Sequence, residues 1–341
     1  MESLLEVKNL KTYFYNDDDE TAAVDGVSFE LKKGETLGLV GESGSGKSVT
    51  SLSILQLIQK PHGKIIDGEV IFKGKDLVKM GEREIRKVRG NDISMIFQEP
   101  MTSLNPVFTV GNQIMEVLIQ HQSLSKKDAR LRAIEMLRVV GIPSAEQRVD
   151  QYPHQLSGGM RQRVMIAMAL ACNPDLLIAD EPTTALDVTT QAQILELMNE
   201  LKEKLETAIL LITHDLGVVA ETADKVAVMY LGRIVEYSDV EIFFEEPKHP
   251  YSQGLIKSVP NLDERVDRLN PIIGQVPHPS EVKSGCRFAS RCEFVQPICL
   301  QDEPNLIDLQ GHKVRCWKYS DNWVEKGVEP NAGEITSSRG A

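Results

Sequence analysis

The sequence predicts an α/β fold in which a large domain is followed by a smaller one. The chain has 341 residues, more than a single hydrophobic core usually serves. Two apolar runs, residues 176–179 and 208–213, resemble buried parallel strands, and a helix-like segment at residues 189–206 separates them. This alternation is typical of α/β domains. Beyond about residue 245 prolines accumulate and helical periodicity fades, so we place a domain boundary near residue 258.

The large domain is predicted to begin with strands and to continue through several helices. Residues 4–40 alternate short apolar stretches with polar turns, which is typical of strands. Apolar residues recur at helical spacing over residues 48–60 and over residues 109–140, so these segments are predicted as helices. A further helix is expected to begin at Ser157, because serine is a favoured cap at helix N-termini.

Composition and charge argue against several classes of protein. The formal net charge is -12, which disfavours broad electrostatic binding to nucleic acid or to anionic lipid. The longest apolar runs, such as residues 164–172, are about half of a membrane span. The N-terminal residues lack the pattern of a secretory signal, so we expect a cytoplasmic protein. Its 5 cysteines are an odd number and argue against a disulfide framework.

Residues 41–48, GESGSGKS, match the pattern of a phosphate-binding loop. A strand-like segment precedes the loop and a helical pattern follows it, as the motif requires. The glycines allow close approach to phosphate, and the loop amides and helix N-terminus form an anion site. Lys47 is expected to reach the β- and γ-phosphates, and the Ser48 hydroxyl to bind Mg²⁺. The predicted nucleotide-binding residues of the loop are Gly41, Glu42, Ser43, Gly44, Ser45, Gly46, Lys47 and Ser48.

Two carboxylates at the end of an apolar run are predicted to complete the site. Asp180 and Glu181 directly follow residues 176–179. Asp180 is the expected partner of Mg²⁺ or of its water, while Glu181 is placed to orient or deprotonate an attacking water. His214 follows residues 208–213 and is predicted to hydrogen-bond the γ-phosphate. Alone, such residues are more often solvated or structural, but the phosphate loop in the same chain favours catalytic roles for Glu181 and His214.

The segment LSGGMRQR, residues 156–163, indicates a second anion site. Ser157 can cap a helix, while Gly158 and Gly159, with Met160 after them, allow close approach to its positive end. Because one ATP already has its phosphate loop, a second anion site suggests that two chains share nucleotides. This segment resembles the signature motif of ATP-binding cassette (ABC) proteins, in which it completes the ATP site of the partner subunit. The resemblance covers about residues 4–245.

The ABC resemblance implies a detailed domain organisation. A nucleotide-binding domain over residues 1–258 is expected to contain a RecA-like core, an antiparallel β subdomain and a helical signature subdomain at about residues 100–172. After it we expect a small cysteine-rich C-terminal domain over residues 259–320. Residues 321–341 are expected to form a flexible tail.

The same resemblance assigns roles to further residues. It implies that Gln98, in IFQEP, is the Q-loop glutamine and binds Mg²⁺ together with Ser48 and Asp180. It also makes Asp187, in TALD, the D-loop aspartate and His214 the switch histidine. An aromatic residue near the start should stack on adenine, and Phe14 is our choice, with its neighbours Tyr13 and Tyr15 left open. Met160 departs from the glutamine that many cassettes have there, which could weaken one contact without removing the Ser-Gly-Gly amides.

Narrower features resemble one branch of the family, the bacterial dipeptide and oligopeptide import ATPases. They are the segments at residues 99–118, 152–160 and 249–255 and the cysteine-bearing tail. The resemblance implies an ATP-hydrolysing subunit on the cytoplasmic face of the cell membrane. It further implies a heterodimer with a second related ATPase, two transmembrane permease subunits, and an extracellular substrate-binding protein that acts through them. Nickel importers share the branch, so nickel stays open as an alternative substrate.

The implied mechanism is a clamp in which two ATPs bridge two cassettes, and residues 99–115 are the predicted contact with the permease. The rivals are a soluble ABC ATPase acting on DNA or ribosomes and a non-catalytic regulatory cassette. Only 108 residues separate Ser48 from Ser157, too few for the long coiled coil of chromosome proteins. The chain also has one set of motifs, whereas translation factors generally carry two.

Four of the cysteines gather near the C-terminus at Cys286, Cys292, Cys299 and Cys316, while Cys172 lies in an apolar run and is expected to be a core residue. Soft thiolates favour zinc or an iron-sulfur cluster. The spacing C-x5-C-x6-C-x16-C is wider than structural zinc sites prefer, and it is not that of bacterial ferredoxins. The family resemblance favours a [4Fe-4S] cluster. Zinc and unliganded cysteines remain as alternatives.

Overall fold

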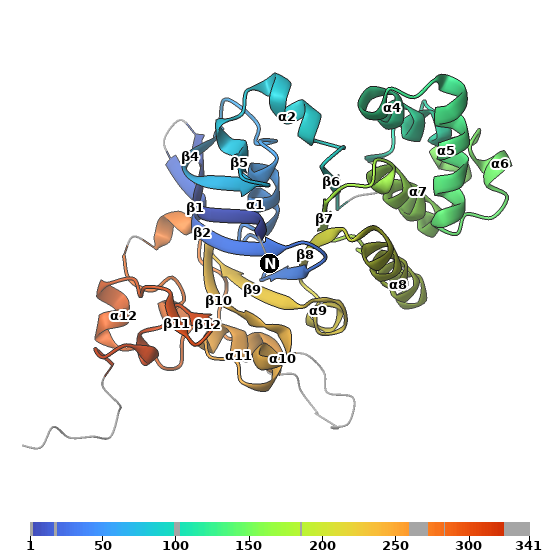
Figure 1. The fold of residues 1–341 in the computed structure, drawn as a ribbon. Coiled ribbons are helices and arrows are strands. Elements are labelled where there is room, and N and C mark those ends of the chain that lie inside the picture. The colour runs from blue at the N-terminus through green and yellow to red at the C-terminus, as the bar shows by residue number, and fades with distance from the viewer. Residues whose placement is uncertain are drawn as a thin grey trace, which may run out of the picture.

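The computed structural model describes residues 3–16, 19–98, 103–184, 186–258, 272–282 and 284–323 of the chain. Figure 1 shows an antiparallel sheet above a larger mixed sheet, with a helical part, α4 to α7, on one side of them. The C-terminal elements lie at the opposite side, where they continue the larger sheet. The α/β class predicted from the sequence is confirmed.

Five neighbouring strands of the larger sheet are parallel, in the order β9-β3-β8-β7-β6, and β6 is an edge of the sheet. Every residue of β3, β7 and β8 is buried. Burial on both faces explains why these strands are nearly continuous apolar runs rather than alternating ones. The two parallel strands expected near residues 176–179 and 208–213 are confirmed as the neighbours β7 and β8. The strands are β3 (Thr36–Val40), β6 (Ile93–Ile96), β7 (Leu176–Asp180), β8 (Ala208–Thr213) and β9 (Lys225–Tyr230).

Two hydrophobic cores lie on opposite faces of this sheet. Leu177 and Ala179 of β7 pack with the helices on one face, whereas Leu176 and Ile178 pack with α1 and the antiparallel sheet on the other. This division follows from the two-residue period of a strand. The helices that follow the central strands are α1 (Lys47–Ile54), α8 (Val188–Leu205), α9 (Leu216–Thr222) and α10 (Val240–Glu245).

The second sheet is antiparallel, with the order β2-β1-β4-β5. Its apolar side chains join the core that also holds α1 and the inner residues of β3. This sheet corresponds to the antiparallel β subdomain expected from the sequence. Its strands are β1 (Ser3–Asn16), β2 (Asp19–Lys32), β4 (Gly63–Phe72) and β5 (Lys75–Asp76), and α2 (Glu82–Val88) follows them.

The helical part begins each of its main helices with a side-chain cap. Thr109, Ser125 and Ser157 each accept a hydrogen bond from a backbone N–H three residues further on. The expected helices within residues 109–140 and the helix start at Ser157 are therefore confirmed. The elements are α4 (Val110–Gln122), α5 (Lys126–Val139), α6 (Ala145–Arg148) and α7 (Gly158–Leu170).

The helix after the phosphate loop is shorter than the sequence predicts. The apolar spacing indicates a helix to residue 60, but α1 ends at Ile54 and Gln56 has a left-handed backbone with φ 51°. The Gln56 side chain turns inward, and its amide donates to the backbone carbonyl of Met80 at 3.1 Å. Gln56, which periodicity alone assigns to the helix, therefore contacts the segment between β5 and α2 instead.

The described C-terminal residues continue the larger sheet instead of standing apart from it. Strand β12 pairs with β10 through Glu236 opposite Val314, and β11 pairs with β12. Phe288 joins a hydrophobic cluster with residues of β9, α9 and α11. The boundary near residue 258 stays a prediction, since residues 259–271 lie outside the described residues, as does the tail beyond residue 323. The elements are β10 (Arg233–Asp239), α11 (Pro250–Lys257), α12 (Pro297–Gln301), β11 (Ile307–Leu309) and β12 (His312–Val314).

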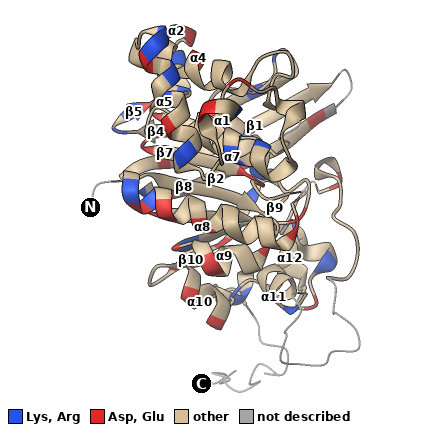
Figure 2. Ribbon diagram, turned by 90° about the vertical axis from the view of Figure 1, so that its right-hand side faces the viewer, with Lys and Arg blue, Asp and Glu red and all other residues tan. Residues whose placement is uncertain are grey.

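Within the described part of the chain, no helix is long and apolar enough to cross a membrane. On the side of the molecule that Figure 2 shows, Lys and Arg residues are interspersed with Asp and Glu residues.

Candidate nucleotide-binding site

The phosphate loop connects β3 to α1 and has a backbone that requires glycine. Gly46 has φ 102°, and a Cβ added to it would lie 2.3 Å from the backbone oxygen of Ala23. Gly41 is equally constrained, since a Cβ there would lie 2.3 Å from the backbone oxygen of Met229. Because α1 begins at Lys47, directly after the loop, its unpaired N–H groups face the place where phosphates would bind.

The Lys47 side chain folds back onto the first residues of this loop. Its ammonium donates to the backbone oxygens of Gly41 at 2.7 Å and of Glu42 at 3.1 Å. Burial lowers the pKa of Lys47, while the carboxylates of Glu181 and Asp180 act in the opposite direction. The ammonium is thus held beside the loop, where the terminal phosphates of a nucleotide would meet it.

Ser48 and Asp180 come together as the sequence predicts for a magnesium site. The Ser48 hydroxyl donates to Asp180 Oδ1 at 3.1 Å, although the two residues lie on α1 and at the end of β7. Burial raises the pKa of Asp180, while the bond from Ser48 acts to lower it. Both residues offer oxygen ligands, which suit Mg²⁺. In nucleotide sites magnesium takes its remaining ligands from phosphates and water.

Glu181 is held by three polar side chains from three different segments. Its Oε2 accepts from Gln98 Nε2 at 2.8 Å and from Thr184 Oγ1 at 3.0 Å, and its Oε1 lies 3.3 Å from His214 Nδ1. Burial alone would raise the pKa of Glu181, but the hydrogen bonds from His214, Thr184 and Gln98 outweigh it and hold the pKa below its usual range. Glu181 also has a left-handed backbone, with φ 47°, a conformation that residues other than glycine adopt uncommonly.

The structure thus brings together residues that the motifs supply from distant parts of the chain. Gln98, Glu181 and His214 form one hydrogen-bonded group beside the contact between Ser48 and Asp180. Thr184 was not predicted from the sequence. Its signal was available, since a hydroxyl three residues after a carboxylate in a turn can reach back to it. The arrangement can hold a carboxylate base ionised next to a phosphate and metal site.

The signature turn lies in the helical part, at the start of α7, apart from the loop between β3 and α1 (Figure 1). Ser157 Oγ accepts from the Met160 N–H at 3.3 Å, and Ser157 and Gly158 are exposed. Gly159 lies against Thr190 at the start of α8, where Asp187 Oδ1 accepts from the Thr190 N–H at 2.9 Å. The exposed end of α7 therefore faces outward, as a surface offered to a second chain would.

The three candidate aromatic residues of β1 have different surroundings. The Tyr13 hydroxyl donates to Asp25 Oδ1 at 3.0 Å. The Lys64 ammonium lies 5.3 Å from the centre of the Tyr15 ring. Phe14 has no such polar partner to satisfy, and an added Cβ on Gly63 would lie 2.9 Å from its ring. The choice of Phe14 as the adenine-stacking residue remains a prediction.

All four C-terminal cysteines line one apolar cavity, together with aromatic side chains that include Phe288 and Trp317. Each is a free thiol, as is Cys172, which is buried in the core. Burial raises the pKa of Cys286 to about 12 and that of Cys316 to about 11, and the neighbouring thiols act in the same direction. Among the described residues, no three His, Cys, Asp or Glu side chains are grouped closely enough to hold a single metal ion.

Two further contacts reach the phosphate loop from the C-terminal part, and the motifs did not predict them. Arg291 forms a bidentate ion pair with Glu42, and the Tyr251 hydroxyl accepts from the Glu42 backbone N–H at 2.8 Å. Glu42 and Arg291 are 249 positions apart in the sequence, so no local pattern could link them.

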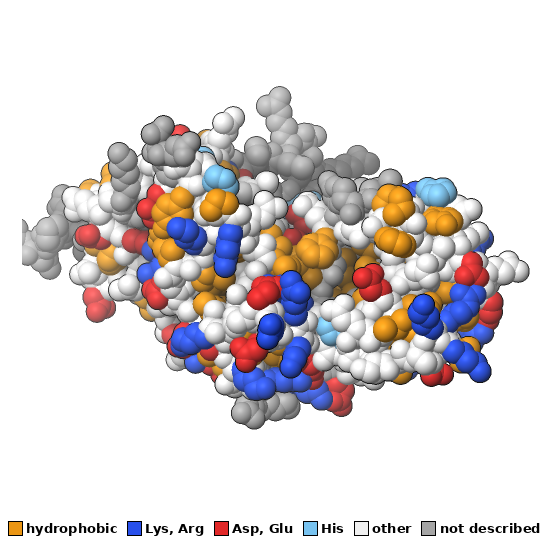
Figure 3. All heavy atoms as spheres, turned by 90° about the horizontal axis from the view of Figure 1, so that it is seen from above, with side chains coloured by type: hydrophobic (Ala, Val, Ile, Leu, Met, Phe, Trp, Pro, Cys, Tyr) orange, Lys and Arg blue, Asp and Glu red, His pale blue; other side chains and the backbone are white. Residues whose placement is uncertain are grey.

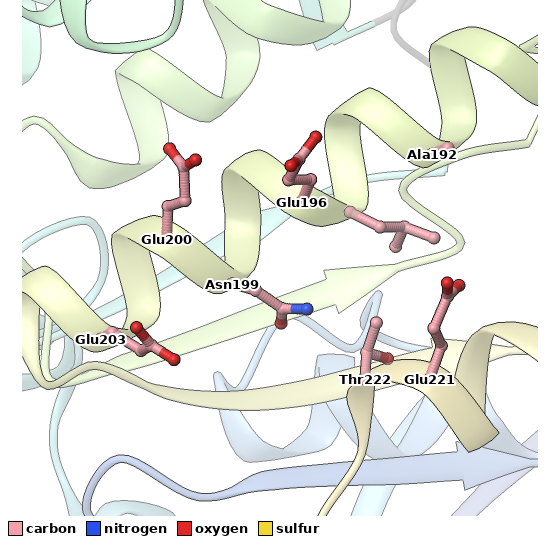
Figure 4. A pocket seen from close by; sticks show the side chains of 8 residues that line it. Ala192, Glu196, Asn199, Glu200, Glu203, Glu221 and Thr222 are labelled. Carbon is pink, nitrogen blue, oxygen red and sulfur yellow. The ribbon is translucent and has the colours of Figure 1, made fainter.

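A hollow between α8 and α9 is acidic and does not suit a nucleotide. Figure 4 shows Asn199 of α8 and Glu221 and Thr222 of α9 pointing toward the space between the helices. Glu196, Glu200 and Glu203 of α8 also line this hollow. Carboxylates would repel phosphate groups, so we assign nucleotide binding to the loop after β3.

Comparisons with known proteins agree with this site. The family model described as "ABC transporter" matches residues 24–184, and the one described as "Oligopeptide/dipeptide transporter, C-terminal region" matches residues 235–299. The oligopeptide transport ATP-binding protein AppD of Bacillus subtilis is 58% identical over 96% of this chain and 100% of its own length. The dipeptide transport ATP-binding protein DppD of the same organism is 52% identical over 93% of this chain and 95% of its own.

Solved structures show the same fold for the catalytic part. The dimeric structure of MJ0796, a bacterial ABC transporter cassette, matches with a TM-score of 0.62 and 30% identity, over 69% of this chain and 98% of that one. The structure of MJ0796 bound to ADP and Pi matches with a TM-score of 0.63 and 29% identity. Together, the nearly full-length similarity and the assembled site show that the chain belongs to the family of ABC transporter ATP-binding proteins, in its oligopeptide and dipeptide transport branch.

Proposed function

We propose that this chain binds and hydrolyses ATP to drive the import of oligopeptides or dipeptides across a bacterial cytoplasmic membrane. The observation that carries the catalytic part is the position of Glu181, which three side chains hold beside the Ser48 and Asp180 pair. The peptide branch is supported by the printed functions of the relatives, which concern oligopeptides and dipeptides. None of those names concerns nickel, the alternative substrate.

Each site residue has a distinct role in this proposal. The loop amides and Lys47 bind the β- and γ-phosphates, and Phe14 stacks on adenine. Ser48 and Asp180, together with Gln98, hold Mg²⁺, which neutralises negative charge on the phosphates. Glu181 accepts a proton from the attacking water, because its lowered pKa keeps it ionised near neutral pH. His214 orients Glu181 and reaches toward the γ-phosphate.

A second cassette completes the site. Ser157, Gly158, Gly159 and Met160 contribute to the ATP site of a related partner subunit, and Asp187 lies at the same interface. The exposure of the α7 N-terminus supports this role, since Ser157 and Gly158 have no covering chain among the described residues. The dimeric MJ0796 cassette gives a precedent for pairing. A heterodimer is our proposal for this chain.

The permease contact is proposed at residues 99–115. Residues 99–102 lie outside the described residues. Further along the same segment, Val107 is 70% exposed and Phe108 is 50% exposed. Phe97, just before the segment, is 43% exposed. Figure 3 shows the molecule from above. On this face, hydrophobic side chains gather on the helical part and in the hollow between it and the rest of the molecule. Exposed apolar groups of this kind are typical of protein interfaces.

The chain is therefore proposed to lie on the cytoplasmic face of the membrane through two permease subunits, with an external binding protein acting through them. The rival interpretation, a soluble ABC ATPase acting on nucleic acid or ribosomes, receives no support from the net charge of -12. Membrane fractionation separates the two readings. The chain should sediment with membranes only when its permeases are co-expressed.

We place a [4Fe-4S] cluster at Cys286, Cys292, Cys299 and Cys316. The fit rests on all four thiols lining one apolar cavity. A single zinc ion needs its four sulfurs about 2.3 Å away, which would bring them close together. No group of three or more His, Cys, Asp or Glu in the described part of the chain is spaced to hold a metal ion, so the shared cavity is the structural support for this proposal.

Anaerobic purification tests this assignment. The protein should be brown and contain about four iron and four sulfide per chain, as a [4Fe-4S] cluster requires. Cys299→Ser should lose the iron, while Cys172→Ser, which alters the cysteine outside the cavity, should keep it. A colourless wild-type protein that contains zinc would contradict the cluster.

The ATPase proposal is tested with Glu181→Gln, which keeps the shape of the side chain and removes the base. ATP hydrolysis by the assembled transporter should fall by about a hundredfold or more, because general-base catalysis contributes roughly 10² to 10⁴. ATP binding should be retained, so that nucleotide-dependent pairing with the partner subunit persists. Unchanged phosphate release by this variant would refute the role of Glu181.

A further inference from the structure

Glu42, the second residue of the phosphate loop, is held by two residues of the C-terminal part. The Arg291 guanidinium donates to both Glu42 carboxylate oxygens, at 2.6 Å and 3.1 Å. The Tyr251 hydroxyl accepts from the Glu42 backbone N–H at 2.8 Å. The side chain and the backbone of one loop residue are thus fixed at the same time.

Arg291 is built into this position. Its side chain is only 4% exposed, and its guanidinium carbon lies 5.8 Å from the centre of the Tyr230 ring and 5.9 Å from that of Phe288. The guanidinium also donates to the backbone oxygen of Ile273 at 3.2 Å. The bond to Glu42 raises the pKa of Arg291, so the residue stays charged. A bidentate pair in such a buried setting has a defined geometry, unlike a solvated ion pair.

The backbone of Arg291 is fixed by a tight turn. Arg291 ends the 3₁₀ turn Ala289–Arg291, and its N–H donates to the backbone oxygen of Phe288 at 3.0 Å. The turn lies between Cys286 and Cys292, and the Ala289 N–H donates to the backbone oxygen of Cys286 at 2.9 Å. Hydrogen bonds therefore restrain the backbone that carries the guanidinium.

Tyr251 is fixed as firmly from the other side. It is fully buried near the start of α11, and its N–H donates to His249 Nδ1 at 3.0 Å. The His249 N–H in turn donates to the buried carboxylate of Glu236 at 2.7 Å. The Tyr251 ring packs edge-on against Tyr230, with 4.7 Å between the ring centres. The sequence His-Pro-Tyr at residues 249–251 therefore ends in a hydroxyl aimed at the phosphate loop.

These contacts have a direct electrostatic consequence. The backbone oxygens of Gly41 and Glu42 accept hydrogen bonds from the Lys47 ammonium. A displacement of Glu42 would therefore also displace the phosphate-binding lysine. An unpaired Glu42 carboxylate would add a negative charge beside the place where the terminal phosphates bind. Arg291 removes both effects, because it neutralises the carboxylate and holds it away from the loop amides.

We propose that Arg291 and Tyr251 are positioning residues of the nucleotide site, through which the C-terminal part sets the affinity of the phosphate loop for ATP. The proposal rests on the proposed function only in taking ATP as the ligand of the loop. Neither residue contacts the reacting atoms. Their effect belongs to nucleotide binding and leaves the chemical step unchanged.

The test uses Arg291→Ala in the assembled transporter, with ATP affinity measured by equilibrium binding and turnover by phosphate release. The Kd and KM for ATP should rise by about tenfold, as expected when a buried charged hydrogen bond is broken, while kcat stays within about twofold. Arg291→Lys should have an intermediate effect, since a lysine keeps the charge but not the bidentate contact. Tyr251→Phe should raise Kd several-fold, about as expected for one lost hydrogen bond.

A charge rescue separates positioning from general damage. In Arg291→Ala combined with Glu42→Gln, the unpaired carboxylate is gone but the contact that positions the loop is still missing, so only part of the lost ATP affinity should return. The matched control is Arg130→Ala, which removes another bidentate pair, with Asp150 at 2.7 Å for both bonds, in the helical part. That variant should bind ATP as wild type does.

Two results would overturn the proposal. One is a folded Arg291→Ala protein with wild-type Kd and KM, and the other is a loss confined to kcat. If Arg291→Ala does not fold, the Arg291→Lys and Tyr251→Phe variants carry the same measurement and the same criteria. Failure of the wild-type chain to bind ATP would instead refute the proposed function, and so the two failures are distinguishable.

Discussion

At the scale of single residues, the catalytic role that we propose for Glu181 depends on keeping its carboxylate ionised in a partly buried site. Burial works against ionisation, and hydrogen bonds from His214, Thr184 and Gln98 work for it and prevail. The same three donors fix the direction in which the carboxylate points. Removing one donor should therefore change the protonation of Glu181 as well as its orientation.

The first prediction concerns the pH dependence of ATP hydrolysis. Because the pKa of Glu181 is lowered, the wild-type rate should stay level as the pH falls from about 8 to about 6 and should drop only below that. His214→Ala removes the side chain that lowers the pKa of Glu181 most, although its 3.3 Å contact is the longest of the three. This pKa should rise, so the residual activity of the variant should begin to fall at a higher pH. A profile of kcat/KM against pH measures the shift. Thr184→Val is the matched control, with a smaller shift in the same direction, and an acid limb that does not move in His214→Ala would contradict the account.

Site residues differ in how far the sequence reveals them. The phosphate loop, Asp180 and Glu181 were predictable because their spacing is local and their residue types follow from the chemistry. The contact of Arg291 with Glu42 was not predictable, since 249 positions separate the partners and an arginine between two cysteines carries no signal of its own. Tyr251 was recognisable only as part of a family pattern, and its role at the loop comes from the fold.

At the scale of elements, the C-terminal part acts as a support for the catalytic sheet. Strand β12 adds to the edge of the sheet next to β10, and α11 lies against the cluster that contains β9. Phe288 is the contact point, since its ring lies 5.2 Å from that of Tyr230 and 5.4 Å from that of Tyr251. The same ring also lines the cavity that contains the four cysteines.

The second prediction is that Phe288→Ala destabilises the protein by about 3–5 kcal/mol, because a buried aromatic side chain is lost and a cavity is left. Phe288 is 3% exposed, so nearly all of its surface is involved. Chemical denaturation of the purified subunit measures the change. Phe108→Ala is the control, since that ring is 50% exposed and its loss should change stability by about 0.5 kcal/mol or less. Equal stability of the two variants would show that the C-terminal part is not a support.

The fold was predictable where an element repeats a clear apolar pattern and was not where tertiary contacts decide. The buried strands β7 and β8 and the capped helix α7 appear where the sequence places them. Helix α1 ends early because the Gln56 side chain is used to hold a neighbouring loop. Strand β12 has only three residues, His312–Val314, and forms because β10 offers an open edge, which no local pattern announces.

At the scale of the whole molecule, the exposed start of α7 is the surface through which we propose that the chain completes a site on another subunit. A Cβ added to Gly158 would meet no atom within 4 Å. The fold of this chain therefore has room for a side chain at this position, and the proposed partner would approach the same surface. Gly111 in α4 is the opposite case, since a Cβ there would lie 2.3 Å from the Val149 side chain.

The third prediction follows from this contrast. Gly158→Asp should leave the thermal unfolding of the isolated subunit unchanged within about 0.5 kcal/mol, yet lower the ATPase activity of the assembled transporter by about tenfold or more, because it places a carboxylate against the partner's nucleotide. Gly111→Ala should show the reverse pattern, with lower stability and near-normal specific activity of the folded fraction. Full activity of the Gly158→Asp transporter would exclude this turn from the interface.

The central claim, that ATP hydrolysis by this chain drives peptide import, is tested most directly by uptake of a radiolabelled peptide into liposomes that contain the assembled transporter. Uptake should require ATP in the liposome lumen, which corresponds to the cytoplasm, and the binding protein outside. It should stop when a non-hydrolysable analogue replaces ATP. Under the account, wild-type transporter accumulates peptide against its gradient and the Glu181→Gln transporter does not. Equal accumulation with and without hydrolysable ATP, or by both proteins, would contradict it.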